Sequence, residues 1–173
     1  MADNRLRIRA EIAADQAVIH ALTRTAFKDQ PYADGDEQAV VDRLRDRGAL
    51  TLSLVALAGD TLVGQVTFSP AQREDGSGPW FALGPVSVLP QRQSRGIGGA
   101  LIRAGLEDLR ERGALGCILT GNPAYYERFG FALAGAHAPA NEPAEYFMVK
   151  LLGASALPAT PISRFAFHPG FYG

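Results

Sequence analysis

A glycine-rich turn between an apolar strand and an amphipathic helix sets the firmest limit on how this chain folds. Residues 80–89 predict the strand, residues 91–99 (QRQSRGIGG) form the turn, and residues 98–112 repeat apolar side chains at helical spacing. Glycines at such a junction let a ligand approach the backbone closely, and the free amides of the helix N-terminus favour an anion. Arg92 and Arg95 add charged donors. The pattern predicts either a diphosphate site or only a tight strand-to-helix turn.

Two familiar nucleotide-binding signatures are missing from this turn. A P-loop requires a glycine, four residues and then Gly-Lys-Ser or Gly-Lys-Thr, and no such run occurs in the sequence. A Rossmann fingerprint would place glycine where Leu101 stands and an acidic residue about 20 positions further on. Residues 114–124 contain no acid. Neither of these nucleotide-binding folds is therefore expected.

Apolar periodicity along the rest of the chain predicts an α/β (α+β) domain, with one mixed, mostly antiparallel sheet and helices on both faces. Asp15 is expected to cap the first helix, and Gly48 to end the second. The predicted strands are residues 6–9, 52–57, 61–69, 80–89, 115–119, 131–134 and 146–151, and the predicted helices are residues 16–26, 37–47, 98–112 and 123–128.

The dipeptide Gly84-Pro85 interrupts the apolar strand at residues 80–89. Proline cannot donate to a sheet ladder, and glycine weakens a strand. The dipeptide therefore indicates a bulge, a place where the neighbouring strand parts from this one, or an edge strand. Taken alone, it favours the edge strand.

Composition excludes several classes of protein. The 173 residues, 47% of them apolar, suit one soluble domain with a full-sized core. A net charge of −1, from 17 basic and 18 acidic residues, argues against nucleic-acid binding and against disorder. One cysteine and three scattered histidines predict neither a disulfide nor a metal site. No apolar run reaches the roughly 18 residues of a membrane helix, and residues 1–9 show no signal peptide, so we expect a cytoplasmic protein that binds no membrane.

Two runs resemble motifs of a single enzyme superfamily. Residues 83–98 (LGPVSVLPQRQSRGIG) resemble the acyl-coenzyme A signature Gln/Arg-x-x-Gly-x-Gly/Ala of the GNAT N-acetyltransferases. Residues 121–131 (GNPAYYERFGF) are similar to the next block of that superfamily, a short helix with a tyrosine that ends in Gly-Phe. The resemblance is greatest to small stand-alone bacterial acetyltransferases. It implies a GNAT fold, with an N-acetyltransferase domain at residues 1–157 and an aromatic tail at residues 158–173.

The resemblance also implies how a cofactor binds. In such enzymes the fourth and fifth strands splay apart, and the pantetheine arm bonds to the fourth strand as another strand would. A backbone amide there polarises the thioester carbonyl, and the turn holds the pyrophosphate. The implied residues are Val86, Ser87, Val88, Gln93, Ser94, Arg95, Gly96, Ile97, Gly98, Gly99, Ala100 and Asn122. Asn122 is equally well interpreted as a plain turn initiator before Pro123.

Tyr126 occupies the position whose hydroxyl, by the same resemblance, reaches the coenzyme sulfur. A thiolate leaving group with a pKa near ~8.5 is protonated by a nearby phenol with a pKa of ~10, if solvent can reprotonate that phenol. Tyr126 is therefore the predicted general acid, and the neighbouring Tyr125 is expected only to pack the helix.

No general base is predicted, because the strand at residues 80–89 contains no carboxylate. Asp34, Asp36 and Glu37 are candidates, but capping and stabilising the second helix is the favoured interpretation of all three. In the family, the loop that contains them walls the acceptor site. Its acidic side chains either attract a cationic amine or form a solvated loop. Cys117 lies in an apolar strand and is expected to be a buried, inert thiol.

These observations predict an N-acetyltransferase that transfers the acetyl group of acetyl-CoA to a primary amine by direct attack in a ternary complex. The alternatives are a non-catalytic acyl-CoA binding or sensing module and a transferase for a longer acyl group. Phe165, Phe167, Phe171 and Tyr172 make the tail too apolar to remain in solvent. It packs on the domain, beside the acceptor site, or across the partner of a homodimer, and the sequence leaves these open.

Overall fold

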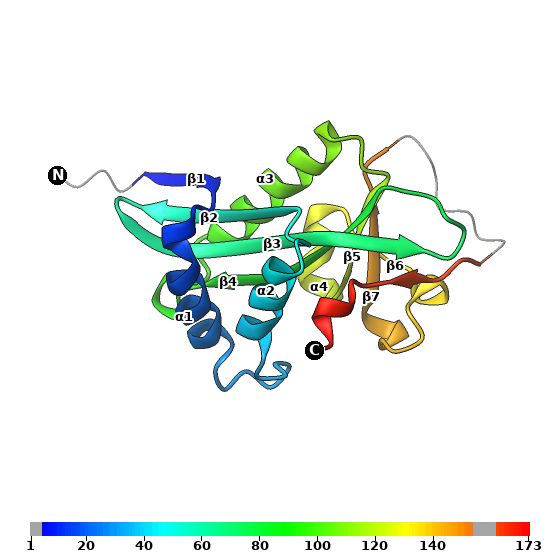
Figure 1. Cartoon of the computed structure of the whole chain (residues 1–173), viewed down its shortest axis with the longest axis horizontal. Coiled ribbons are helices and arrows are strands. Elements are labelled where there is room, and N and C mark those ends of the chain that lie inside the picture. Colours follow the sequence, from blue (N-terminus) through cyan, green and yellow to red (C-terminus); the bar gives the residue numbers. More distant parts are fainter. Residues whose placement is uncertain (1–4, 154–161) are drawn as a thin grey trace.

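The structure is a computed structural model that describes residues 5–153 and 162–173. Its helices and strands follow the predicted order, and one strand that was not predicted, β8 (Phe165–Ala166), comes after them (Figure 1). The other strands are β1 (Leu6–Ala10), β2 (Leu52–Ala58), β3 (Thr61–Arg73), β4 (Trp80–Val88), β5 (Gly116–Thr120), β6 (Ala132–Leu133) and β7 (Phe147–Leu151). The helices are α1 (Gln16–Phe27), α2 (Glu37–Asp46), α3 (Ile97–Glu111) and α4 (Pro123–Tyr126), with short 3-10 turns that include η3 (Glu127–Phe129) and η6 (Pro169–Phe171). None of the helices in the described ranges is long and apolar enough to cross a membrane.

Eight strands of the described residues form one mixed sheet. Seven of them lie in the order β1-β2-β3-β4-β5-β7-β6, and β8 pairs with β3. Every pair is antiparallel except β4 and β5, which are parallel. The predicted α/β (α+β) class, with a mixed and mostly antiparallel sheet, is confirmed.

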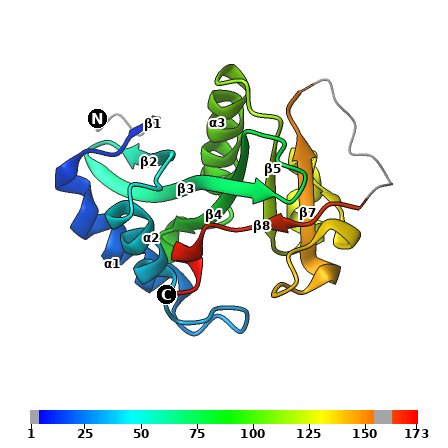
Figure 2. The same cartoon turned by 45° about the vertical axis from the view of Figure 1, so that its right-hand side comes forward.

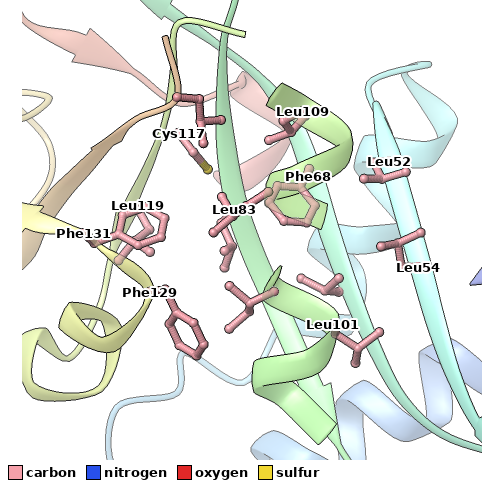
Figure 3. Packing of buried hydrophobic residues seen from close by; sticks show 14 of the residues in the cluster. Leu52, Leu54, Phe68, Leu83, Leu101, Leu109, Cys117, Leu119, Phe129 and Phe131 are labelled. Carbon is pink, nitrogen blue, oxygen red and sulfur yellow. The ribbon is translucent and has the colours of Figure 1, made fainter. Parts of the chain in front are cut away.

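Helices cover both faces of this sheet, as predicted. Alternate residues of β2 show the division, because Leu54 packs in the cluster that α3 covers, whereas Val55 packs beneath α1 and α2. Figure 3 shows Leu101 and Leu109 of α3 directed at the sheet, with Phe68 of β3 beside them. The hydrophobic cluster that contains these residues is the largest part of the core, and it packs α3 against β3 and β4.

One glycine on α3 is required by this packing. A side-chain carbon on Gly105 would lie 2.1 Å from the ring of Phe68, which is fully buried. The missing side chain therefore lets the helix approach the sheet closely. This contact holds the middle of α3 close to β3.

The last described segment, residues 162–173, lies across the face of the sheet opposite α3 (Figure 2). β8 pairs with the end of β3, and the rings of Phe165 and Phe167 are buried. Farther on, η6 reaches α2, where Nε of Arg43 donates to the carbonyl of Gly170 at 2.9 Å. This part of the aromatic tail covers its own domain. The predicted boundary between residues 157 and 158 lies outside the described residues.

Two local predictions hold only in part. Asp15 is the N-cap residue of α1, as predicted, but its side chain does not cap the helix; its carboxylate accepts from the amide of Ile12 at 2.8 Å and pairs with Arg9 at 2.6 Å. The third strand does not end at residue 69 but continues through Pro70 to residue 73. The extension is stabilised because it pairs with both the start of β4 and β8.

Candidate active site

β4 parts from β5 at the Gly84-Pro85 dipeptide. β5 pairs only with residues 80–82 of β4, so beyond them the edge of β4 that faced β5 is uncovered. Between residues 83 and 86, β4 also carries one residue more than the facing stretch of β3, which is a bulge. The φ angle of Gly84 is +130°, a value that glycine adopts readily. β4 is thus an internal strand; the edge-strand interpretation was wrong, and the parting of two strands is what the dipeptide marks.

Beyond the bulge, the uncovered edge of β4 presents backbone hydrogen-bonding groups. The Leu89 amide donates to the Val63 carbonyl at 2.9 Å, so these two residues form a hydrogen-bonded pair. Hydrogen-bonded and non-hydrogen-bonded pairs alternate along an antiparallel ladder. Ser87 therefore faces β3, whereas Val86 and Val88 direct their N–H and C=O groups to the opposite edge. An extended ligand can bond to this edge as a further strand.

Two of the residues predicted to bind the cofactor use their side chains within the protein. Ser87 is buried, and its hydroxyl donates to the Thr23 hydroxyl of α1 at 3.3 Å. Its side chain therefore does not face the uncovered edge, and its backbone N–H and C=O groups face β3 instead. Gln93 donates from Nε2 to the carbonyl of Val88 at 3.1 Å, so it occupies one acceptor of that edge.

The turn after β4 leaves the N-terminal amides of α3 without helical partners. The first helical hydrogen bond runs from the Ala100 amide to the Gly96 carbonyl at 3.0 Å. The amides of residues 97–99 precede it and point out of the helix end. Ser94 and Gly96 both have positive φ angles, +61° and +81°, and Arg95 between them is exposed. Turns of this kind, with the helix dipole behind them, bind anions.

The space beside this helix end is bounded by β4 and α4. A side-chain carbon on Gly98 would lie 3.2 Å from the hydroxyl of Tyr125 and 3.7 Å from Cγ2 of Val88. The amides of α3, the uncovered edge of β4 and the start of α4 therefore meet at one place. The predicted binding residues of the turn and of β4 lie together there.

Tyr126, the predicted general acid, lies on α4 at this junction. Its ring is half-buried and packs against Phe129 and Phe131, with ring centroids 6.3 and 6.0 Å away. Burial raises the pKa of the Tyr126 phenol above its ordinary value. At neutral pH its hydroxyl is therefore protonated and able to donate.

Asn122 begins α4 as its cap. Its Oδ1 accepts a hydrogen bond from the Ala124 amide at 3.0 Å. This contact agrees with the turn-initiator interpretation of Asn122. A bond from its side-chain NH₂ group to pantetheine stays a prediction.

Tyr125 is the residue that sequence reasoning missed. Predicted only to pack α4, it also places its hydroxyl beside Gly98, at the first turn of α3. The guanidinium of Arg128 lies over its ring, 4.7 Å from the centroid. Nothing in the local sequence distinguishes Tyr125 from a packing aromatic, because the contact joins elements about 27 residues apart along the chain.

The acidic loop before α2 uses its carboxylates for its own structure. Glu37 accepts from the amides of Asp34 and Gly35 at 2.7 and 3.1 Å. Asp36 pairs with Arg43 at 3.1 Å. These contacts agree with the favoured interpretation, in which the acids stabilise the start of the second helix. No contact of the structure assigns one of them as the general base.

Cys117 lies on β5 with its side chain fully buried in the cluster beneath α3, as predicted. Burial raises the pKa of this thiol well above its ordinary value. A thiol must ionise to act as a nucleophile. The geometry therefore gives no support to a cysteine-linked acyl intermediate.

Comparisons with known proteins identify the family of this chain. The family model of the acetyltransferase (GNAT) domain matches residues 7–134. An uncharacterized N-acetyltransferase of Escherichia coli K12, YhbS, is 37% identical over 131 residues, which are 75% of each chain. The crystal structure of YhbS from E. coli in complex with CoA has a TM-score of 0.86 at 32% identity and covers 98% of this chain and 94% of that one.

A second solved structure is similar over almost the whole chain. It is a GNAT family acetyltransferase from Brucella melitensis in complex with acetyl-CoA, with a TM-score of 0.83 and 42% identity. The match covers 97% of this chain and 99% of that one. The chain therefore belongs to the GNAT family of acetyltransferases and is an acyltransferase enzyme.

Proposed function

We propose that this enzyme transfers the acetyl group of acetyl-CoA to a primary amine by direct attack of the amine on the thioester. The observation that carries the proposal is the junction of the uncovered edge of β4 with the N-terminal amides of α3. The uncovered edge of β4 suits an extended arm that contains amide groups, and the N-terminal amides of α3 suit a diphosphate. Acetyl-CoA contains both groups, linked in that order. The CoA complexes of two similar enzymes support the same assignment.

The residues of this chain would divide the work of binding. The backbone groups of Val86 and Val88 would bond the pantetheine arm, and an amide of this edge would polarise the thioester carbonyl. The amides of residues 97–99, with Arg95, would hold the pyrophosphate. The gap between β4 and β5 would place the thioester carbon where an amine can approach.

The reaction balances without a covalent enzyme intermediate. The neutral amine forms a bond from nitrogen to the carbonyl carbon, the nitrogen loses one proton to solvent, and the C–S bond breaks. The departing sulfur either accepts a hydrogen bond from the hydroxyl of Tyr126 and is protonated by solvent, or takes the Tyr126 proton, which solvent then replaces. The burial of Cys117 favours this direct route over an acyl-cysteine.

The raised pKa of Tyr126 refines its proposed role. A phenol with a pKa above 10 is a weaker acid than an aqueous thiol with a pKa near ~8.5, so full proton transfer in water would be uphill. A thiolate in the same half-buried surroundings is itself destabilised, which brings the two pKa values together. Tyr126 would therefore act chiefly by hydrogen bonding to the negative charge that develops on sulfur.

The test is amine-dependent release of free thiol. The purified enzyme is mixed with acetyl-CoA and a panel of primary amines that includes polyamines, amino-acid amides and short peptides. We expect thiol release above the rate without amine for at least one acceptor, and a product heavier by one acetyl group. Tight binding of acetyl-CoA with no turnover against any amine would contradict the proposal and favour an acyl-CoA binding module. Release that is faster with a longer acyl-CoA would instead identify a different acyl donor.

A further inference from the structure

A basic pocket adjoins α3 on the side that faces η3. Its volume is about 240 Å³, and it is bounded by α3, η3 and the end of β7. Four cationic side chains and one carboxylate line it: Arg103, Arg110, Arg128, Lys150 and Glu107. None of these residues takes part in the acetyl transfer described above.

The positive charge of this pocket is largely uncompensated. Glu107 lies 4.0 Å from Arg110, and both side chains are more than half exposed, so this pair is weak. Within residues 5–153 and 162–173, Arg103, Arg128 and Lys150 form no ion pair. Four cations against one carboxylate leave a net charge of +3 around the pocket. Such a cluster repels itself unless an anion binds.

Aromatic rings hold two of the guanidinium groups in place. Arg103 lies over Phe129, 5.0 Å from the ring centroid, and Phe129 reaches toward α3 from the segment after α4 (Figure 3). Arg128 lies over Tyr125 and donates from Nε to the Tyr125 carbonyl at 2.9 Å. Stacking fixes each planar cation while its outer N–H groups stay free to donate. The arginines are therefore arranged for an anion before one arrives.

The same arginines flank the first turn of α3. A side-chain carbon on Gly99 would lie 3.1 Å from Nη1 of Arg103. The ring beneath Arg128 belongs to Tyr125, whose hydroxyl lies beside Gly98. An anion on the amides of residues 97–99 thus has both arginines next to it. Because the pocket is smaller than the roughly 300–1,000 Å³ of sites that enclose a whole ligand, it suits one further group of that ligand.

We propose that this basic pocket binds the ribose 3′-phosphate of coenzyme A. The inference rests on the proposed function, because it takes the pyrophosphate to lie at the N-terminus of α3. Coenzyme A carries one phosphate beyond that pyrophosphate, on the ribose of its adenosine. Two stacked arginines and Lys150 give this group charged donors from three different elements. The enzyme therefore selects coenzyme A over 3′-dephospho-coenzyme A.

Calorimetric titration with the two cofactors tests the pocket. We expect the intact protein to bind coenzyme A at least roughly tenfold more tightly than dephospho-coenzyme A, since hydrogen bonds between charged groups contribute about 1.5–3 kcal/mol. Lys150→Gln should reduce that ratio several-fold and leave the dissociation constant of dephospho-coenzyme A unchanged. The matched control is Arg112→Gln, which removes the same charge from the end of α3 at a side chain that pairs with Asp108 outside the pocket.

A variant that should bind coenzyme A more tightly completes the test, because a misfolded protein would lose affinity and not gain it. Glu107→Gln removes the only carboxylate of the pocket lining, so it should tighten coenzyme A binding several-fold and leave dephospho-coenzyme A unaffected. Glu111→Gln makes the same change one turn along α3, outside the pocket, and should leave the affinity for both cofactors unchanged. Equal affinity for both cofactors in the unmodified protein, or an equal gain from both glutamate variants, would overturn this inference alone. If neither cofactor binds, the proposed function fails with it.

Discussion

Replacing Gly98 by valine tests whether the space beside the first turn of α3 accommodates the phosphates of the cofactor. A first side-chain carbon at this position would lie 3.2 Å from the Tyr125 hydroxyl and 3.7 Å from Val88 Cγ2. The shorter distance requires a shift of a few tenths of an ångström, which the end of a tyrosine side chain can make. The two methyl groups of valine would extend farther, into the space between β4 and α4.

The size of the effect follows from what valine changes. Within a helix, glycine is about 1 kcal/mol and valine about 0.6 kcal/mol less favourable than alanine, so the stability of α3 should not fall. Binding should suffer, because the phosphates can no longer approach the amides of residues 97–99. Loss of one hydrogen bond to a charged group costs about 1.5–3 kcal/mol, which corresponds to more than a tenfold rise in the dissociation constant.

Titration calorimetry with coenzyme A measures this change, and thermal unfolding of the same samples monitors the fold. Gly98→Ala should have an intermediate dissociation constant, because its single carbon requires only the small shift of Tyr125. A folded Gly98→Val protein with the affinity of the unmodified enzyme would refute the assignment of α3 to the pyrophosphate.

Three further predictions concern charge, packing and pH. Arg95→Ala should weaken coenzyme A binding more at 20 mM than at 500 mM salt, since salt screens an exposed charge; a loss independent of salt would indicate packing of its aliphatic stem instead. Gly105→Ala should lower the free energy of unfolding by about 1–3 kcal/mol, because the new carbon overlaps the ring of Phe68. Adding Phe68→Leu to this variant should restore part of the lost stability. The hydrogen bond from Arg9 lowers the pKa of Asp15, so this carboxylate stabilises the fold above its ordinary pKa of about 3.9 and loses that effect as the pH falls through its folded value. Urea unfolding should therefore find Asp15→Asn less stable than the unmodified protein at pH 7 but equal to it near pH 2; a constant difference would contradict this.

The fold could be predicted from the sequence because its signals are local. The apolar stripe of α3 and the alternation along β2 and β3 each require only a few neighbouring residues. The turn at residues 91–99 was correctly placed between a strand and a helix, although its glycines alone fit a tight turn as well as a diphosphate site. Errors arose where pairing overrode local preference. Pro70 remains in β3 because two strands pair around it, and β8 forms because β3 offers it an edge.

The site was less predictable, because it depends on which side chains meet. Taken alone, Gly84-Pro85 favours an edge strand, and the parting of two strands becomes visible only because β5 pairs with residues 80–82 of β4. The role of Tyr125 depends on its distance from Gly98, and the basic pocket joins Arg103 to Lys150 across 47 positions of the chain. No periodicity encodes such contacts. Ser87 is the opposite case: it was predicted to bind the cofactor, but its side chain contacts Thr23 and does not face the uncovered edge.

The turnover number of Tyr126→Phe tests the proposed chemistry most directly. The change removes one hydroxyl and keeps the ring that packs against Phe129 and Phe131. With an amine that the unmodified enzyme acetylates, and with chemistry limiting the rate, we predict that kcat falls roughly 10- to 1,000-fold while KM for acetyl-CoA stays close to its original value. Tyr125→Phe makes the same change on the same helix and should raise KM for acetyl-CoA a few-fold without lowering kcat, since its hydroxyl lies beside Gly98. A Tyr126→Phe enzyme with unchanged kcat would contradict a role for this hydroxyl at the departing sulfur.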